Sequence, residues 1–291
     1  MRDFLKNSME QIYNDFIEEL DNMDCCCELK NLRFDSANIP NYSNRIIQQL
    51  YLLRYFPAYL FEYFDVYSDL IKKHSLEDYN VLSIGSGCGI DYYGLHFALD
   101  RNNESICYTG VDKINWSYRF DLENDEYYFI NEDISNWDKL DWDGYNILIF
   151  PKSIGEFTEK DFKKLLDMLR RSKFKHEDIY IISSIRELND DIDTRRLVKI
   201  INVLEKKHKY KCLDDKTTYT HYIENVGIRK FFDDFIYPDE ILSEILQILN
   251  HCNKYKENGY NSCEHDCESL LNKWPILKTG HIKYQIKKLS K

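Results

Sequence analysis

The chain has 291 residues, of which 43% are hydrophobic and 15% aromatic, and its formal net charge is -11. This composition excludes a low-complexity disordered chain, and the acidic charge disfavours broad, non-specific binding to nucleic-acid backbones. No apolar run is long enough for a transmembrane helix, and the charged start MRDFLKNSMEQ lacks the apolar core of a signal peptide. We therefore expect a cytoplasmic protein that does not enter membranes, with nine cysteines that are reduced or bind metal.

Two helices are expected near the start of the chain. Apolar residues in 4–20 recur at intervals of three and four, which is typical of one buried helix face. A second helical pattern runs from about Ser43 to Lys73 and is aromatic nearly all round. Pro57 is expected to kink or divide this helix, because proline lacks the amide donor and clashes with the preceding turn.

From residue 80 onward, short apolar runs alternate with helical stretches. The runs are VLSIG (81–85), ICYTGVD (106–112), YYFI (127–130), YNILIF (145–150) and DIYIISS (178–184), with helices expected at 91–101, after 112, from Thr158 and at 191–209. This rhythm predicts βαβ units and a mostly parallel sheet. We divide the chain into 1–76, a domain at 77–237, and a Cys-rich appendage at 238–291 that ends in the strand-like HIKYQIKKL.

Three glycines, Gly85, Gly87 and Gly89, follow the first of these runs at every second position. Glycines between a strand and a helix permit a tight turn and close approach of a ligand to the backbone, and the helix offers free N–H groups. The dinucleotide fingerprint G-x-G-x-x-G would need a third glycine where Ile90 stands. A nicotinamide dehydrogenase is therefore the weaker interpretation.

At this turn and in the motifs that follow it, the chain resembles the class I S-adenosylmethionine-dependent methyltransferases. VLSIGSGCG takes the position of their first motif, YTGVD the second, NEDI the third, and YNILIF followed by PKSIGEF the fourth. The resemblance covers roughly residues 80–236. It implies an α/β, Rossmann-like, mostly parallel seven-stranded sheet with helices on both faces. It also implies S-adenosylmethionine as cofactor and transfer of its methyl group to an acceptor.

The resemblance assigns cofactor roles by position. The glycines would line the methionine part, Asp112 would bind the ribose hydroxyls, and Asp133 with Ile134 would contact the adenine. Many members have an acidic residue where Ser83 stands, and Asp91 could supply that carboxylate. The implied cofactor-binding set is Ser83, Gly85, Ser86, Gly87, Gly89, Asp91, Asp112, Lys113, Asp133, Ile134 and Pro151. The alternatives are that Asp112 caps a helix and that Asp133 is a turn residue.

The segment PKSIGEF supplies the candidate catalytic residues Lys152, Ser153 and Glu156. Methyl transfer is an in-line displacement, so the enzyme mainly holds the nucleophile in a dry site, and some nucleophiles also need a general base. Ser153 and Glu156 also have the spacing of a helix capping box. The segment lacks the N/D-P-P-aromatic motif, which argues against methylation of nucleic-acid amino groups.

Additions before the first motif often close over the substrate in this superfamily. Segment 1–76 is therefore predicted to be a helical cap, with Arg54, Tyr55 and Tyr59 as candidate substrate-binding residues. Core packing is the alternative for each tyrosine.

The tail holds a set of possible zinc ligands, Cys252, Cys263, His265 and Cys267. Cys263 and Cys267 are four residues apart, so both thiolates can face one ion, and zinc takes such S/N sets tetrahedrally. Free thiols in a polar loop are the alternative. Lys206, Lys207, Lys209 and Lys211 could contact RNA phosphates, or they form a solvated face.

The acceptor is not specified by these motifs. A small molecule fits the acidic charge and the aromatic cap. RNA or protein fits a zinc module and the basic last segment, which contains Lys273, Lys278, Lys283, Lys287, Lys288 and Lys291. The alternative function is a non-catalytic binding or regulatory protein that keeps the methyltransferase fold.

Overall fold

A computed structural model describes residues 1–23, 26–30, 32, 34, 40–99, 105–122, 126–139, 142–186, 190–221, 237–245, 248–257, 259, 270–271 and 282–291. The chain forms two compact units, which we call the helical unit and the sheet unit. The helical unit comprises Met1–Phe61, Trp116–Phe120 and Arg229–Thr279; the sheet unit comprises Glu62–Asn115, Asp121–Ile228 and Gly280–Lys291. The expected division into a helical cap at 1–76, a catalytic domain at 77–237 and a Cys-rich appendage at 238–291 stays a prediction.

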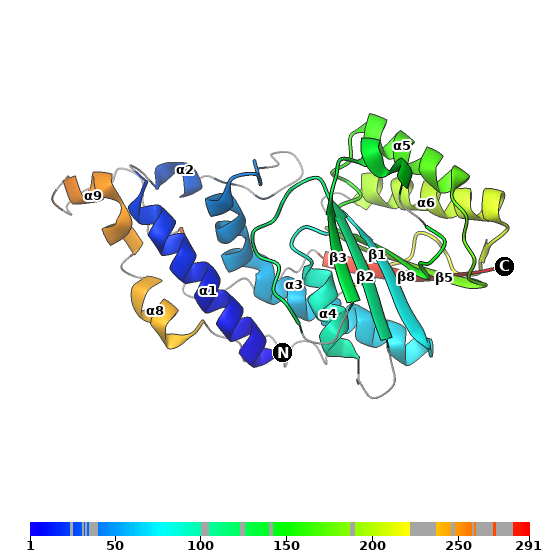
Figure 1. Cartoon of the computed structure of the whole chain (residues 1–291), viewed down its shortest axis with the longest axis horizontal. Helices are drawn as coiled ribbons and strands as arrows, with labels where there is room; N and C mark the ends of the chain where they lie inside the picture. Colours follow the sequence, from blue (N-terminus) through cyan, green and yellow to red (C-terminus); the bar gives the residue numbers. More distant parts are fainter. Residues whose placement is uncertain are drawn as a thin grey trace. The chain divides into compact units, whose positions relative to one another are not determined.

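Figure 1 shows the helices and strands along the chain. The helices are α1 (Arg2–Asp21), α2 (Cys27–Lys30), α3 (Arg45–Lys73), α4 (Ile90–Ala98), α5 (Glu159–Arg171), α6 (Asp190–His208), α8 (Asp239–Ile245) and α9 (Asn253–Glu257), with 3-10 helices η1 (Ile134–Lys139) and η4 (Ile248–His251). The predicted apolar face of α1 is confirmed, because its Leu5, Met9, Ile12 and Phe16 are fully buried. None of the helices in the described ranges is both long and apolar enough to cross a membrane.

The sheet unit is built on one mixed sheet. Its strands are β1 (Asp78–Ile84), β2 (Ser105–Asp112), β3 (Glu126–Asn131), β4 (Ile147–Pro151), β5 (Asp178–Arg186), β6 (Lys211–Cys212), β7 (Thr220–His221) and β8 (Ile282–Ser290). Their order is β3-β2-β1-β4-β5-β8-β6, with β7 also paired to β8. Strands β1 to β5 are parallel, and β8 runs antiparallel to β5.

The Rossmann-like α/β fold expected from the sequence is confirmed by this order, in which β1 lies between β2 and β4. Across the described ranges the sheet has eight strands rather than seven, because the two-residue β7 is added to it. The strand-like end of the chain is also confirmed, and β8 pairs with β5 over nine positions. The last strand in the sequence thereby becomes an interior strand of the sheet, between β5 and β6.

Helices cover both faces of the sheet (Figure 1). On one face, Leu82 and Ile84 of β1 pack in a core with apolar residues of α5 and α6. On the other face, Tyr108 of β2 contacts α4, and Gly94 of α4 packs against Tyr63 of α3. Alternate residues of each strand point to opposite faces, which explains why the strands read as nearly continuous apolar runs.

Helix α3 continues through Pro57 and is not divided there. Proline has no N–H to donate to the carbonyl four residues earlier, which belongs to Leu53. The phenol of Tyr237 donates to that carbonyl at 2.6 Å. A side chain from a distant segment thus supplies the missing hydrogen bond, and the helix persists.

The helix expected after β2 is absent from the described residues 113–122. Its place is taken by an irregular segment in which Trp116 and Tyr118 are buried and Ser117 between them is exposed. The Ser117 N–H donates to the Gln48 side chain of α3 at 2.9 Å. Burial at every second residue is incompatible with a helix, which explains the failed prediction.

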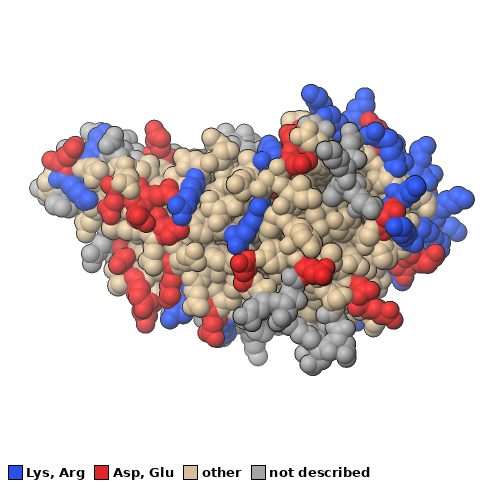
Figure 2. Space-filling view, in the orientation of Figure 1, with Lys and Arg blue, Asp and Glu red and all other residues tan. Residues whose placement is uncertain are grey.

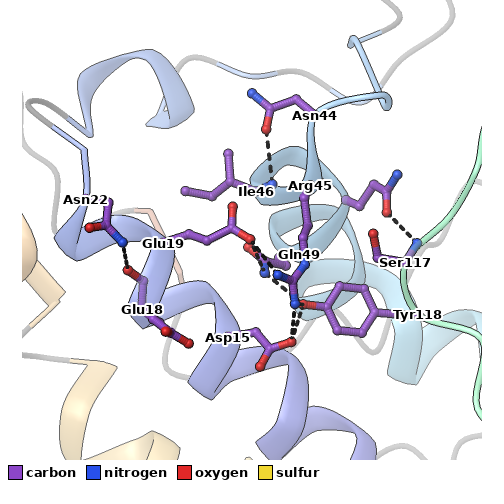
Figure 3. Close-up of polar contacts among 11 residues, drawn as sticks. Asp15, Glu18, Glu19, Asn22, Asn44, Arg45, Ile46, Gln49, Ser117 and Tyr118 are labelled. Carbon is purple, nitrogen blue, oxygen red and sulfur yellow. Dashed lines mark hydrogen bonds and ion pairs between the residues drawn. The ribbon is translucent and has the colours of Figure 1, made fainter.

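Tyr118 is held by charged residues of the helical unit (Figure 3). Its hydroxyl donates to Asp15 at 2.9 Å and accepts from the Gln49 amide at 2.7 Å. Arg45 bridges Asp15 at 2.6 Å and Glu19 at 3.3 Å. The segment that follows β2 is therefore an integral part of the helical unit.

Candidate cofactor and active site

The glycine turn after β1 has the backbone that its spacing predicts. Gly85, Gly87 and Gly89 have φ values of 74°, 59° and 84°, in the left-handed region that favours glycine. A Cβ at Gly85 would lie 2.8 Å from the Ser153 hydroxyl, and one at Gly89 would lie 2.6 Å from the Phe129 ring. The turn therefore needs glycine for its conformation and for the close packing around it.

Asp112 at the end of β2 is joined directly to this turn. Its half-buried carboxylate accepts the N–H of Gly87 and the N–H of Ile114, each at 2.8 Å. Two backbone donors from different segments fix the orientation of the carboxylate. The alternative role as a helix cap does not apply, since no helix begins in the described residues 113–122 that follow β2 directly.

Asp91 lies in the first turn of α4 and is fully buried. The Tyr108 hydroxyl approaches both of its carboxylate oxygens at 3.1 Å. Burial raises the pKa of Asp91 to about 7, although the hydroxyls of Ser83 and Tyr108 and the charge of Lys152 act in the opposite direction. A carboxylate therefore lies beside Ser83, on the helix rather than on the strand.

In the turn after β4, the Ser153 hydroxyl has a structural role. Ser153 is buried, and its hydroxyl donates to the Ile84 carbonyl at the end of β1. Glu156 is exposed, and its N–H donates to the Ser153 carbonyl at 2.9 Å. The expected capping box of these two residues is wrong, because α5 begins later, at Glu159, and Thr158 caps it by accepting the Asp161 N–H at 3.1 Å.

Lys152 forms a buried ion pair with a residue that motif analysis missed. Its ammonium lies 2.6 Å from the carboxylate of Glu62 in α3, and the two side chains are 8% and 1% exposed. The other Glu62 oxygen accepts the Ser184 hydroxyl of β5. Glu62 lies in an aromatic helix segment with no motif around it, so only its unusual place among apolar residues could have drawn attention to it.

The remaining predicted cofactor residues lie at or just after the carboxyl ends of β2, β3 and β4. Lys113 and Asp133 are exposed, and Pro151 is half-buried at the end of β4. The Asp133 carbonyl accepts the N–H of Asn136 in η1 at 2.8 Å, and Ile134 is buried in the apolar core. The adenine contacts of Asp133 and Ile134 stay predictions.

The candidate substrate residues belong to the helical unit. The Arg54 guanidinium donates to the Leu270 carbonyl at 2.9 Å and to the Leu32 carbonyl at 3.3 Å. Tyr55 and Tyr59 stack with ring centroids 5.5 Å apart, and Tyr59 is 2% exposed. These contacts agree with the core-packing alternative, and substrate binding by the three residues stays a prediction.

The expected zinc ligands fall largely outside the described residues. Cys263, His265 and Cys267 are not described, whereas Cys252 is a buried free cysteine in the helical unit. Hydrogen bonds from the Cys26 backbone and thiol act to lower the pKa of the Cys252 thiol against the effect of burial. Over the part of the chain that the structure describes, no group of three or more potential ligands is assembled.

The residues around the glycine turn fit the cofactor that the resemblance implies. The left-handed glycines give the turn a backbone that residues with side chains rarely adopt, and Asp112 presents a carboxylate of fixed orientation. The Ser86 hydroxyl is buried and has no hydrogen-bond partner among the described residues, so it is available to a ligand. Backbone groups and carboxylates suit a molecule that carries hydroxyls and positive charge.

The fold and this turn together define a Rossmann-like class of architecture. No family model matches the chain, and no curated protein matches its sequence. Solved structures of methyltransferases are similar to it. The plantazolicin methyltransferase BpumL, in complex with a pentazolic desmethylPZN analogue and S-adenosylhomocysteine, is 14% identical, with 94% of this chain and 98% of that chain covered and a TM-score of 0.43. Magnesium protoporphyrin IX methyltransferase from Synechocystis PCC 6803, with bound SAM, is 13% identical over 54% of this chain and 71% of that chain, with a TM-score of 0.35.

Proposed function

We propose that the chain is an S-adenosylmethionine-dependent methyltransferase. The observation that carries the proposal is the hydrogen bond between the Gly87 N–H and the Asp112 carboxylate, which joins the glycine turn to the acidic end of the next strand. A ribose with two hydroxyls is the ligand group that such an oriented carboxylate recognises in Rossmann-like sites. When bound, the cofactor supplies an electrophilic methyl group on a sulfonium.

The chain's own residues contribute orientation and exclusion of water. Asp112 and the bare backbone of the glycine turn would bind the cofactor, with Asp91 buried behind them. Ser153 is engaged with the Ile84 carbonyl, and Lys152 is paired with Glu62, so neither is poised as a general base. We therefore infer that acceleration comes from positioning, and that an acceptor which must lose a proton delivers it to another group.

The acceptor class that we favour is a small molecule, because the chain is acidic overall. A nucleic-acid acceptor is the alternative, and one observation favours it. Segments 159–175 and 195–211 together contain 14 Lys and Arg against 4 Asp and Glu. They include α5 and most of α6, which pack side by side, and Figure 2 shows the basic side chains gathered over these helices.

Calorimetric titration with S-adenosylmethionine and S-adenosylhomocysteine tests the function. We expect micromolar binding that is lost in Asp112→Ala and kept in the control Asp167→Asn, which removes an exposed carboxylate of α5. Absence of binding in the natural chain, also after addition of zinc, would favour the non-catalytic interpretation. Metal analysis of the same sample measures the zinc predicted for the tail.

Acceptor screening follows only if the cofactor binds. A small-molecule library and a structured RNA pool are offered with labelled cofactor. If RNA is the acceptor, its binding should weaken steeply with salt, and replacing Lys206, Lys207 and Lys209 with glutamate should reduce it at every RNA sequence.

A further inference from the structure

The buried pair of Lys152 and Glu62 stands at the carboxyl end of β4, where Lys152 has a φ of 58°. This left-handed conformation is rare for a residue with a side chain, and such strain persists only where the surroundings enforce it. The Lys152 N–H donates to the Ser184 carbonyl at 3.0 Å, so both the backbone and the ammonium of this residue are held. The position of the Lys152 ammonium is therefore fixed from both the backbone and the side chain.

Stability alone does not explain why a charged pair occupies this place. Replacing a buried ion pair with apolar side chains of similar size is often neutral or stabilising, because taking two charges out of water is costly. Here the Lys152 ammonium also lies 4.6 Å from the centre of the Tyr63 ring and 3.3 Å from its hydroxyl. These contacts surround the charge with partners inside the protein.

The pair lies within electrostatic reach of the glycine turn. Ser153, the next residue, packs against Gly85 and donates to the Ile84 carbonyl. The charge of Lys152 also acts on Asp91, which follows the turn directly. An unpaired ammonium here would add a positive charge to the side of the site where the methionine part of the cofactor is expected.

We propose that Glu62 is a charge-compensating and positioning residue that lets this site accept a sulfonium by neutralising Lys152. The proposal rests on the proposed function. S-adenosylmethionine and S-adenosylhomocysteine share their other charged groups, and only the first carries the positive sulfur. Like charges repel strongly where little water separates them. Glu62 therefore controls the preference of the site for the cofactor over its demethylated product.

The test measures the dissociation constants of both ligands by calorimetry at about pH 6.5, well below the usual pKa of lysine. The variants are Glu62→Gln, Lys152→Met and the double variant. Glu62→Gln should weaken S-adenosylmethionine on the order of tenfold relative to S-adenosylhomocysteine, since one charge is left unpaired. Lys152→Met should shift the ratio of the two affinities toward S-adenosylmethionine or leave it unchanged. The double variant should restore the ratio of the natural chain.

Glu205→Gln is the matched control, because Glu205 pairs with Lys216 elsewhere in the sheet unit. It should leave the ratio of the two affinities unchanged. If Glu62→Gln weakens both ligands equally, the pair is merely structural and the proposal is overturned. If Glu62→Gln does not fold, the other two variants decide. The proposal is then overturned if Lys152→Met shifts the preference toward S-adenosylhomocysteine while the double variant keeps the preference of the natural chain. Failure of the natural chain to bind either ligand contradicts the proposed function instead.

Discussion

Tyr237 donates its phenol hydrogen bond to the Leu53 carbonyl, which Pro57 leaves without a donor in α3. Tyr237→Phe should lower the free energy of unfolding by about 1–3 kcal/mol, because the carbonyl is then buried without a partner. Urea unfolding measures this loss. Tyr13→Phe is the control, since the Tyr13 hydroxyl is buried without a hydrogen bond among the described residues, and its removal should be nearly neutral.

A double-mutant cycle identifies the cause. In Pro57→Ala, residue 57 regains an N–H that can donate to Leu53 within the helix. Tyr237→Phe should then cost clearly less in the Pro57→Ala background than in the natural chain. Equal costs in both backgrounds would show that Tyr237 acts through packing alone.

Gly85→Ala should destabilise the sheet unit and abolish cofactor binding. The residue has a φ of 74°, and a Cβ would lie 2.8 Å from the Ser153 hydroxyl. We expect a loss of about 1–3 kcal/mol in unfolding free energy. Gly144→Ala is the matched control, because a Cβ there would meet no atom within 4 Å. A Gly85 variant as stable as the control would contradict the packing described for the turn.

Asp91 should make the folded chain less stable as pH rises. Its pKa is about 7 when folded, against an ordinary value near 4, so between these values the folded chain binds more protons than the unfolded chain. The stabilising protonation is complete below about pH 4 and is lost as pH rises through 7, a decline on the order of 4 kcal/mol.

Urea unfolding between pH 5 and pH 8 measures the larger part of this decline. Asp91→Asn should remove part of the decline, whereas the control Asp167→Asn should not, because the Asp167 side chain is 47% exposed. Burial and the charge of Glu62 also raise the pKa of Asp65 to about 7. Asp65→Asn should therefore remove a separate part of the loss of stability with rising pH. Parallel curves for the natural chain and Asp91→Asn would mean that Asp91 is ionised throughout.

Thr158→Ala should lower stability by about 1 kcal/mol through loss of the α5 cap. Glu156→Ala should leave stability nearly unchanged, since Glu156 is exposed and does not cap the helix. Alanine is used because glutamine would preserve a capping box. Thermal unfolding of the two variants decides between the two possible caps. A larger loss in Glu156→Ala would restore the capping box expected from the sequence.

Local patterns in the sequence were enough to predict the main strands, most of the helices and the glycine turn. The run VLSIG predicts β1, and DIYIISS predicts β5, because buried parallel strands are short and continuously apolar. The helix predicted after residue 112 was wrong because Trp116 and Tyr118 are buried by partners in α1 and α3, which no local pattern reveals. Similarly, the helical pattern around Pro57 could not show that Tyr237 would support it.

By itself, the sequence determined the alternation of elements and the residue types of the turn, because hydrophobic period and glycine conformation act over a few neighbouring residues. Only the tertiary structure decided which charges meet. Glu62 and Lys152 are 90 positions apart, and their pairing depends on where α3 packs against the end of β4. Ion pairs between distant segments leave no periodic signal, since a single side chain on each partner is sufficient to form them.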